Sequence, residues 1–254
     1  MSFLQRVNNV VTRNLPVKWV RTRLDAPVAS ITFDDFPRSA WTAGGPILAR
    51  HDAKATYYVA AHFAGRTEDG LEYYTDADLR AVRDAGHELG CHSFSHQRAS
   101  QVKTASLLEE ADRNAQYLQS ILGGDGPSSY AYPFGDVSPR VKVTMSRRFA
   151  SSRGIRPGVN GGKFIDLGQL RAVPLEQRLW LPAAVDAAIE QARASAGWVI
   201  FFTHDVSAAP SPFGCTPEML SYALEKLAAA KIEILPVKHA MARAVFGSGS
   251  GRPH

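Results

Sequence analysis

Short apolar runs alternate with helical patterns along nearly the whole chain, and this alternation constrains the fold more than any other feature. The runs that have the length and composition of strands are Val28–Phe33, Ala55–Ala60, His87–His92, Ser129–Tyr132, Leu170–Val173, Trp198–Thr203 and Ile232–Leu235. The run WVIFFT at 198–203 is apolar almost throughout, which is typical of a strand covered on both faces. Strands of this kind separated by helices predict an α/β fold with a parallel sheet.

Segments between these runs show helical spacing of apolar residues. The predicted helices are Asp76–Ala85, Ala105–Leu122, Ser138–Phe149, Pro182–Ala196 and Pro217–Ala230. The pattern is clearest in Ala105–Leu122, where apolar residues fall on one side and Gly123–Gly124 ends the helix. Alternation alone does not distinguish a barrel from an open doubly wound sheet. The first strand is not followed by a GxGxxG or P-loop motif, which disfavours nucleotide binding.

Length and composition indicate one globular unit. The chain has 254 residues, of which 45% are hydrophobic and 21% charged, and these values argue against disorder. No linker rich in Pro, Gly or Ser divides it. We therefore expect a single domain over 1–254, with a core over about 28–238, an N-terminal extension over 1–27 and a flexible tail over 247–254.

Charge and cysteine content limit the partners and the compartment. The formal net charge is +5, but no segment interleaves basic and aromatic residues, so we expect no nucleic-acid partner. A basic surface attracts an anionic polymer or a membrane surface. Peripheral membrane contact or a lipid-linked substrate is therefore one interpretation of the charge. Cys91 and Cys215 are too few for a disulfide framework. Without an apolar signal-peptide core or a membrane-spanning stretch, the expected location is cytoplasmic.

Polar residues gather where predicted strands end, and the carboxyl ends of parallel strands build the active site in such folds. The first strand ends in Thr32-Phe33-Asp34-Asp35. Successive side chains of a strand point to opposite sides, so the two carboxylates can face a metal ion and the water to be activated, respectively. A solvated loop start or a helix N-cap is the structural alternative.

A pair of histidines follows the third strand, in His92-Ser93-Phe94-Ser95-His96. Residues four apart share one face of a helical turn. Two imidazoles and one carboxylate make a three-ligand set, which is usual for catalytic zinc with a position left open for water. Two further strand ends carry the turn signal Tyr132-Pro133-Phe134-Gly135 and the histidine His204, each of which alone is typical of an ordinary structural role.

Taken in order, the segments TFDD, KATYYV, GHELGCHSFSH, YPFG and FFTH resemble the motifs of the polysaccharide deacetylase, or NodB-homology, family, from roughly Ala29 to Val237. The resemblance implies a distorted (β/α) barrel of about seven parallel strands. The site residues that it implies are Asp34 as general base, Asp35, His92 and His96 as metal ligands, the backbone N–H of Phe134 as a donor to the oxyanion, and His204 as the acid that protonates the departing amine.

The implied reaction needs these groups. An N-acetyl amide is a poor electrophile with a poor leaving group, so a divalent metal polarises its carbonyl and lowers the pKa of water. A carboxylate removes the water proton, and a histidine protonates the nitrogen. Zinc fits the ligand set, and Co²⁺ or Ni²⁺ fits it as well. We expect a metal-dependent hydrolase that removes an N-acetyl group from an N-acetylated sugar or from a glycan precursor of cell-surface polysaccharide.

The chain departs from the family pattern at three points. Phe36 stands where Gly often follows the paired Asp, and we expect its side chain to narrow the pocket mouth. The turn motif lacks the Arg that orients the base, and Arg171 is predicted to replace it, with Arg153 as the second candidate. The Asp-rich motif that supports the acid is not visible, and Asp166 is the nearest carboxylate that can serve.

Two other functions stay open at this stage. One is hydrolysis of a C–N bond in a cyclic amide or ureide on the same scaffold. The other is a carbohydrate-binding protein that has lost catalysis, for which the missing turn Arg and the unseen Asp motif speak. The presence of both Asp34 and His204 speaks against it.

Overall fold

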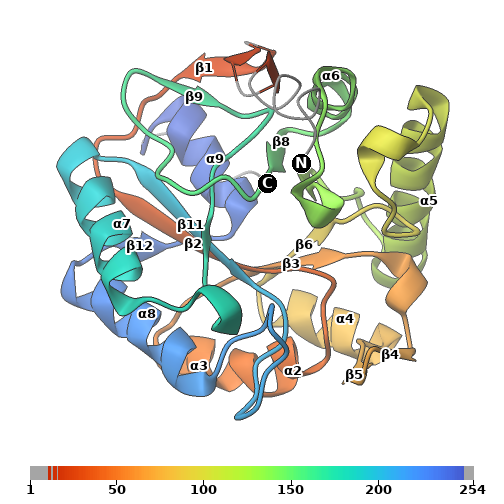
Figure 1. The fold of residues 1–254 in the computed structure, drawn as a ribbon, viewed down its shortest axis with the longest axis horizontal. Helices are drawn as coiled ribbons and strands as arrows, with labels where there is room; N and C mark the ends of the chain where they lie inside the picture. The colour runs from red at the N-terminus through yellow and green to blue at the C-terminus, as the bar shows by residue number, and fades with distance from the viewer. Residues whose placement is uncertain (1–10, 13, 16, 249–254) are drawn as a thin grey trace.

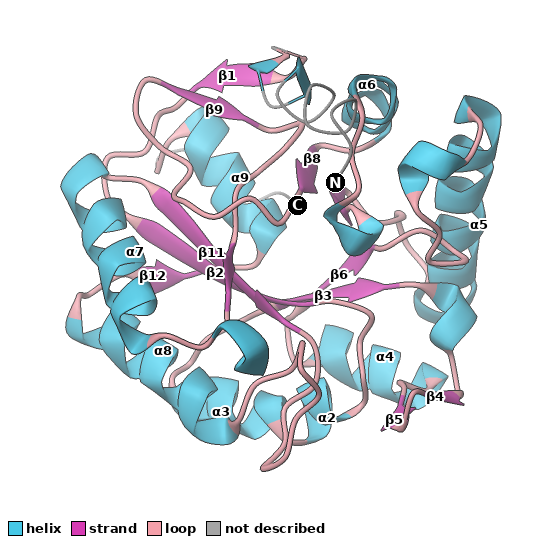
Figure 2. Ribbon diagram, viewed as in Figure 1, coloured by secondary structure: helices cyan, strands magenta, loops and turns pink. Residues whose placement is uncertain are grey.

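The computed structural model describes residues 11–248 apart from residues 13 and 16, and parallel strands form its centre with helices around them (Figures 1 and 2). The strands of the main sheet are β2 (Val28–Phe33), β3 (Thr56–Val59), β6 (Glu88–Cys91), β7 (Ser129–Ala131), β8 (Ser151–Arg153), β10 (Val173–Pro174), β11 (Trp198–Thr203) and β12 (Glu233–Ile234). They follow the order β10-β11-β2-β3-β6-β7-β8, and β12 pairs with the start of β2.

The sheet curves until its two ends meet. All of its strand pairs are parallel. Arg153 in β8 forms a further parallel bridge to Leu170, three residues before β10, so the last strand of the path returns to the first. The predicted distorted (β/α) barrel of about seven parallel strands is thereby confirmed. Its closure places the carboxyl ends of the strands around one rim.

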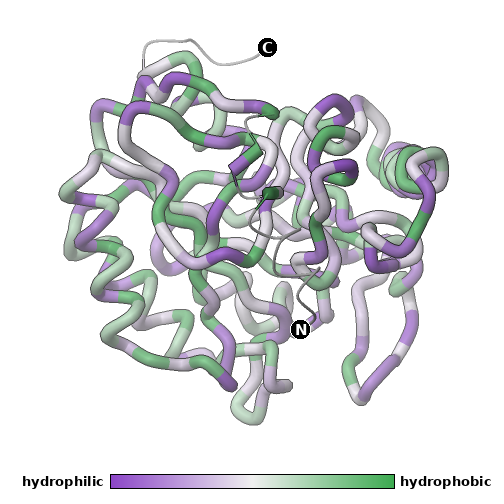
Figure 3. The backbone as a smooth tube through the Cα atoms, turned by 45° about the horizontal axis from the view of Figure 1, so that its top comes forward, coloured by the Kyte–Doolittle hydropathy of each residue, from purple (hydrophilic) through white to green (hydrophobic). Residues whose placement is uncertain are grey.

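Helices cover the outside of the sheet. The five that the sequence predicts lie within about one residue of their predicted bounds: α4 (Asp76–Asp84), α5 (Thr104–Leu122), α6 (Pro139–Arg148), α7 (Pro182–Ser195) and α8 (Pro217–Ala229). Thr75, Ser138 and Thr216 cap three of them by accepting hydrogen bonds from backbone N–H groups. Hydrophobic and hydrophilic positions alternate along these peripheral helices in Figure 3, as expected for helices that bury one face. No described helix has the length and apolar character needed to cross a bilayer.

Several elements were not predicted, for identifiable reasons. Those that join or cover the barrel are α2 (Ser39–Thr42), α3 (Gly44–Arg50), α9 (Val237–Phe246), the two-stranded pairs β1 (Trp19–Arg21) with β9 (Phe164–Asp166) and β4 (Thr67–Glu68) with β5 (Leu71–Glu72), and the 3₁₀ turns η1 (Ala61–Phe63), η2 (Ala99–Gln101), η3 (Pro133–Gly135) and η4 (Gln177–Leu179). Helix α3 begins with Gly44-Gly45-Pro46, which reads as a helix breaker. A Cβ atom at Gly45 would lie 2.6 Å from the Trp41 ring, so packing requires the glycine.

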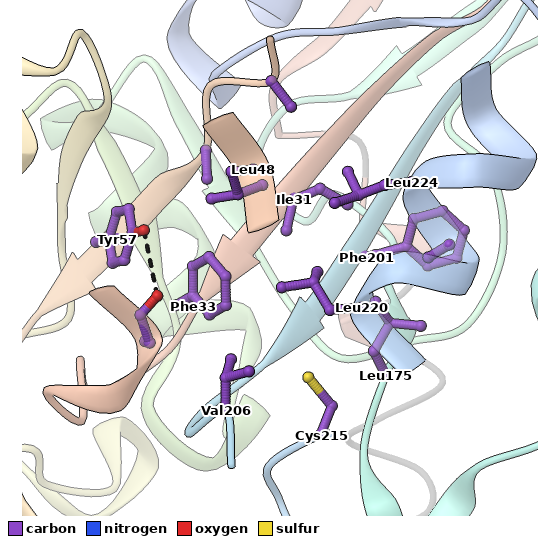
Figure 4. Close-up of a cluster of buried hydrophobic side chains, with 14 of the residues drawn as sticks. Ile31, Phe33, Leu48, Tyr57, Leu175, Phe201, Val206, Cys215, Leu220 and Leu224 are labelled. Carbon is purple, nitrogen blue, oxygen red and sulfur yellow. Dashed lines mark hydrogen bonds between the residues drawn. The ribbon is translucent and has the colours of Figure 1, made fainter. Parts of the chain in front are cut away.

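The barrel wall separates two hydrophobic clusters. Outside it, Ile31, Phe33 and Phe201 of adjacent strands pack against Leu220 and Leu224 of α8, as Figure 4 shows. The opposite faces of the same strands contribute to an inner cluster of Val28, Trp198, Ile200, Phe202 and residues of α9. Helix α9 therefore closes the amino-terminal end of the barrel and leaves the carboxyl-terminal rim open.

The predicted ends of the chain are described only in part. Within the predicted extension 1–27, β1 pairs with β9. In the predicted tail 247–254, Ser248 donates a hydrogen bond to Asp25, while 249–254 lie outside the described residues.

Glu88 joins three strands to α9 at the closed end. Its buried carboxylate accepts hydrogen bonds from Thr56 Oγ1 (2.8 Å), Ser129 Oγ (2.6 Å) and the backbone N–H of Lys238 (2.9 Å). The last of these groups belongs to the first turn of α9, where a negative charge is favourable.

We expect Glu88→Ala to lower the free energy of unfolding by about 3 kcal/mol, because it leaves buried donors without an acceptor. Urea unfolding followed by circular dichroism measures this change. The control is Glu109→Ala on the exposed face of α5, which should change the value by no more than about 0.5 kcal/mol. Equal effects of the two substitutions would contradict the role given to Glu88.

Candidate active site

The end of β2 presents two carboxylates in different directions. Asp34 continues the strand, and its N–H donates to Thr203 O of β11 at 2.9 Å. Asp35 and Phe36 then adopt left-handed conformations with φ of 61° and 56°, which are uncommon for residues other than glycine. This turn sends the Asp35 side chain toward the loop after β6, whereas Asp34 keeps the inward direction of the strand.

Phe36 does not narrow the pocket mouth, so that expectation is wrong. Its side chain is fully buried and packs against the rings of Tyr57 and Tyr74, with centroids 4.7 and 5.1 Å away. The left-handed φ of Phe36 explains why a glycine suits this position. Here aromatic packing offsets the strain.

Asp35, His92 and His96 meet at one point. Asp35 Oδ1 lies 3.3 Å from His92 Nε2 and 3.0 Å from His96 Nε2. One potential ligand atom from each of the three residues lies within 4.8 Å of the other two. Two ligands about 2.1 Å from a tetrahedral ion are separated by about 3.4 Å, so the spacing suits a zinc-sized ion.

The hydrogen bonding of these groups fits a cation. His92 Nδ1 lies 2.8 Å from Ala131 O, and because a carbonyl only accepts, the ring donates its proton there. A neutral His92 then directs a lone pair at Asp35 Oδ1, and two acceptors in contact repel unless a proton or a cation lies between them. Among the described residues, Asp35 Oδ1 is buried without a hydrogen bond. The three residues therefore fit a divalent ion.

Protonation states agree with this fit. Burial lowers the pKa of His96 to about 4, so its imidazole is neutral near pH 7. Burial opposes ionisation of Asp35, but its contact with His92 outweighs burial and holds the pKa of the carboxyl well below its usual range. Burial also opposes protonation of His92, but the same contact with Asp35 raises the pKa of this imidazole, so a proton competes with a metal ion for it. A neutral imidazole and an ionised carboxylate are the forms that bind metals.

Helix α5 holds the histidine loop in place. Glu110 accepts from Ser95 N (2.6 Å) and Ser95 Oγ (3.0 Å), and the Arg113 guanidinium lies 4.0 Å from the centre of the Phe94 ring. His96 itself has a φ of 49°, so its strained backbone follows directly on the residue that Glu110 fixes. Sequence reasoning missed this support because polar residues on one face of a helix read as a solvent-exposed surface.

Arg153, and not Arg171, occupies the position beside Asp34. The guanidinium of Arg153 is 1% exposed, forms an ion pair with Asp34 Oδ1 and lies between the rings of Tyr58 (5.2 Å) and Phe202 (5.0 Å). The prediction for Arg171 is wrong, and the second candidate takes its place. Successive side chains in an extended segment point to opposite sides of the sheet. Leu170 belongs to the inner cluster, so Arg171 points outward.

His204 is held by a backbone carbonyl. Its Nδ1 lies 3.2 Å from Phe213 O, and its Nε2 lies 3.7 Å from Asp35 Oδ2. The loop that carries Phe213 is fixed by the buried Asp205, which accepts from Ser211 N and Oγ at 2.9 and 2.5 Å.

Asp166 does not support His204, so that candidate was also wrong. Its carboxylate lies 2.5 Å from Nζ of the buried Lys142 and accepts from Gly168 N. The hydrogen-bond partner of the histidine in this chain is a main-chain group, which no side-chain motif can reveal.

These residues open into one cleft of about 640 Å³. Phe134 stands at its edge with φ of 59°, its ring 4.5 Å from that of His96. The N–H groups of Gly135 and Asp136 close the turn on Tyr132 O and Pro133 O, whereas that of Phe134 is not used by the turn.

Two cation–aromatic pairs flank the cleft, and sequence reasoning identified neither. The guanidinium of Arg98 lies 4.3 Å from the centre of the Phe134 ring, and that of Arg178 lies 4.6 Å from the centre of the Phe213 ring. The Arg178 guanidinium also forms an ion pair with Glu176 at 2.7 Å. Burial raises the pKa of the Glu176 carboxyl, and only the fold brings this residue to the cleft.

Comparisons with known proteins identify a matching family and a shared fold. A family model described as polysaccharide deacetylase matches residues 21–150, about half of the chain. A chitin deacetylase from Arthroderma benhamiae is 31% identical over 120 residues, which are 46% of this chain and 30% of that protein. The match thus spans less than a third of that relative's length.

Solved structures share the fold. A family 4 acetyl xylan esterase from Clostridium thermocellum, in complex with a cobalt ion, aligns with a TM-score of 0.59 at 22% identity and covers 85% of this chain and 90% of that one. A family 4 pseudoenzyme from Bacillus anthracis aligns with a TM-score of 0.61 at 13% identity and covers 89% and 69%. At these identities the likeness shows the fold alone.

We expect His96→Ala to lower the affinity for a divalent ion by more than about a hundredfold, since loss of a ligand costs more than loss of an outer partner. Zinc binding measured by competition with a chromophoric chelator checks this. His239→Ala, which removes an exposed imidazole on α9, is the matched control. Unchanged zinc affinity in His96→Ala would exclude this histidine as a ligand.

Proposed function

Because the chain belongs to the polysaccharide deacetylase family, we propose that it is a metal-dependent hydrolase that removes an N-acetyl group from an N-acetylated sugar or glycan. The observation that carries the proposal is the convergence in one cleft of a buried carboxylate paired with arginine, an Asp-His-His cluster and a further histidine. Together they supply a base, a metal site and an acid for amide hydrolysis.

In this proposal Asp35, His92 and His96 hold the ion. A divalent ion bound by them supplies Lewis-acid polarisation of an acyl carbonyl and lowers the pKa of water. Zinc suits the two imidazoles and one carboxylate, and cobalt or nickel suits them as well. The hydrogen bond from His92 to Ala131 O fixes the orientation of that ring for this task.

Asp34 acts as the general base. Arg153 holds one of its carboxylate oxygens and leaves the other oxygen to take a proton from water. The arginine is itself held by Tyr58 and Phe202, so the base has a fixed position at the rim. This pair removes one of the two grounds for a non-catalytic carbohydrate-binding protein.

His204 acts as the general acid. Its Nδ1 donates to Phe213 O, and its Nε2 faces the cleft near Asp35 Oδ2. From this position the ring can give a proton to the departing nitrogen. The free N–H of Phe134 lies at the same edge and can donate to the oxygen that gains charge during the attack.

The substrate proposed is an N-acetylated saccharide. The deacetylase relative is named for chitin, a polymer of N-acetylated sugar, and the open cleft of about 640 Å³ accommodates a sugar residue with its acetamido group. Both cysteines are buried and free in the described chain, as a reducing compartment allows. The cytoplasmic location, the role in cell-surface polysaccharide synthesis and the lipid-linked substrate stay predictions.

We expect Asp34→Asn to release acetate from N-acetylated chito-oligosaccharides about 10²–10⁴ times more slowly than wild type, with about one divalent ion still bound per chain. The metal site is expected to stay intact because Asp34 is outside the metal cluster, and circular dichroism checks that the variant is folded after Arg153 loses its ion-pair partner. Acetate assay and metal analysis on the same samples measure both. If the wild-type protein hydrolyses small cyclic amides and releases no acetate, the cyclic amide alternative is favoured. If the wild-type protein binds sugar but turns over neither kind of substrate, the non-catalytic alternative is favoured.

We expect Arg153→Met to lower kcat by about tenfold to a hundredfold, because the base loses the partner that orients it. Buried Asp34 is then unpaired, which lowers stability by about 3–5 kcal/mol, so the rate is compared at a temperature where circular dichroism shows a folded protein. Arg80→Met on the exposed face of α4 is the control for charge. A kcat equal to wild type in folded Arg153→Met would contradict the orienting role.

A further inference from the structure

Arg171 lies in a second pocket, outside the barrel. The pocket has a volume of about 270 Å³ and is lined by residues of the β1–β9 ribbon and of the segment 156–171, among them Trp19, Arg156, Asn160 and Phe164. In Figure 1 the ribbon runs along the upper edge of the molecule, outside the ring of strands. Nothing in the proposed deacetylation uses these residues.

The position of Arg171 is closely specified. The Asn160 side chain accepts from Arg171 N (2.8 Å) and donates to Arg171 O (3.0 Å), so it holds the main chain of the arginine from both sides. The guanidinium passes over Gly158, where an added Cβ atom would lie 2.9 Å from Nη1. Gly158 also has a φ of 132°, which side chains rarely allow. A side chain at this position would therefore displace the arginine.

The charge of Arg171 has no counterion in the part of the chain that the structure describes. None of the ion pairs or side-chain hydrogen bonds found among the described residues involves its guanidinium, although the side chain is partly buried. Asp166, the carboxylate that lines the same pocket, is committed to Lys142 and to Gly168 N. A half-buried guanidinium without an acidic partner is suited to bind a carboxylate or phosphate from a ligand.

An aromatic surface stands beside this charge. Trp19 of β1 and Phe164 of β9 are 51% and 48% exposed, and their ring centroids are 6.5 Å apart with an angle of 30° between the planes. Large aromatic side chains that are exposed side by side are typical of binding sites. The apolar C–H face of a sugar ring packs on such rings, while Gln169 offers an amide group to its hydroxyls.

We infer that this pocket is a second saccharide-binding site, specific for a sugar that bears an anionic group. The rings of Trp19 and Phe164 receive the sugar, and Arg171 binds its carboxylate or phosphate. The saccharide class of the ligand rests on the proposed function, whereas the preference for an anion rests on Arg171 alone. Ile155 lines the catalytic cleft and the adjacent Arg156 lines the second pocket, so neighbouring residues of the chain separate the two sites.

The test compares two disaccharides that differ by one charge. N,N′-diacetylchitobiose is neutral, and the disaccharide of N-acetylglucosamine and N-acetylmuramic acid carries one carboxylate. The full chain is labelled with 5-fluorotryptophan in the Asp34→Asn background, and the ¹⁹F resonance of Trp19 is assigned by its absence in Trp19→Phe. We expect the anionic disaccharide to shift this resonance with a Kd about tenfold lower than that of the neutral one.

Substitutions separate the two parts of the site. Arg171→Ala should bring the Kd of the anionic disaccharide up to that of the neutral one, and Phe164→Ala should weaken both. Arg80→Ala, which removes the same charge from α4, should leave both values as they are. A Trp19 resonance that neither disaccharide shifts, or equal Kd values for both that Arg171→Ala leaves unchanged, would overturn the inference. The resonance reports this pocket directly, so failure to detect acetate release leaves the test valid.

Discussion

The buried ion pair between Arg153 and Asp34 connects the fold to the chemistry. Each of these side chains is almost fully buried. A buried charge without a partner costs several kcal/mol, so each charge offsets the cost of burying the other inside the barrel. The backbone of Arg153 also carries the bridge to Leu170 at which the sheet closes. The closure of the barrel and the position of the proposed base therefore depend on one residue of β8.

Backbone strain is concentrated around the same rim. Asp35, Phe36, Ser93, His96 and Phe134 all have left-handed φ values, between 49° and 62°, although none is a glycine. Each conformation costs about 1–3 kcal/mol and persists only where the surroundings hold it. Aromatic packing holds the turn after β2, and α5 holds the loop after β6. The strain turns consecutive side chains toward a common point, which a regular strand end cannot do.

The two arginines considered for the base lie on neighbouring segments of the sheet and point to opposite sides of it. Arg153 points into the barrel and serves the catalytic cleft, whereas Arg171 follows the inward Leu170 and points to the outer pocket. Their surroundings differ accordingly. The inner guanidinium has a carboxylate and two aromatic faces, whereas the outer one lies beside exposed aromatic rings, and the one carboxylate that lines its pocket is paired with Lys142. A guanidinium that is paired within the protein supports structure and catalysis, while a guanidinium without an acidic partner is available to a ligand.

Much of this molecule follows from the sequence alone, because periodicity and local motifs are local properties. Apolar runs and amphipathic spacing determined the long strands and helices, and the ordered motifs indicated the carboxylate and histidines that the fold then brings together. The sequence did not reveal β8, because its buried residues Ser151–Arg153 are all polar and form no apolar run. It also did not decide between Arg153 and Arg171, or find the carbonyl of Phe213 beside His204. Those contacts join residues that are distant along the chain, or use main-chain atoms common to all residues, so only the closure of the barrel decided them.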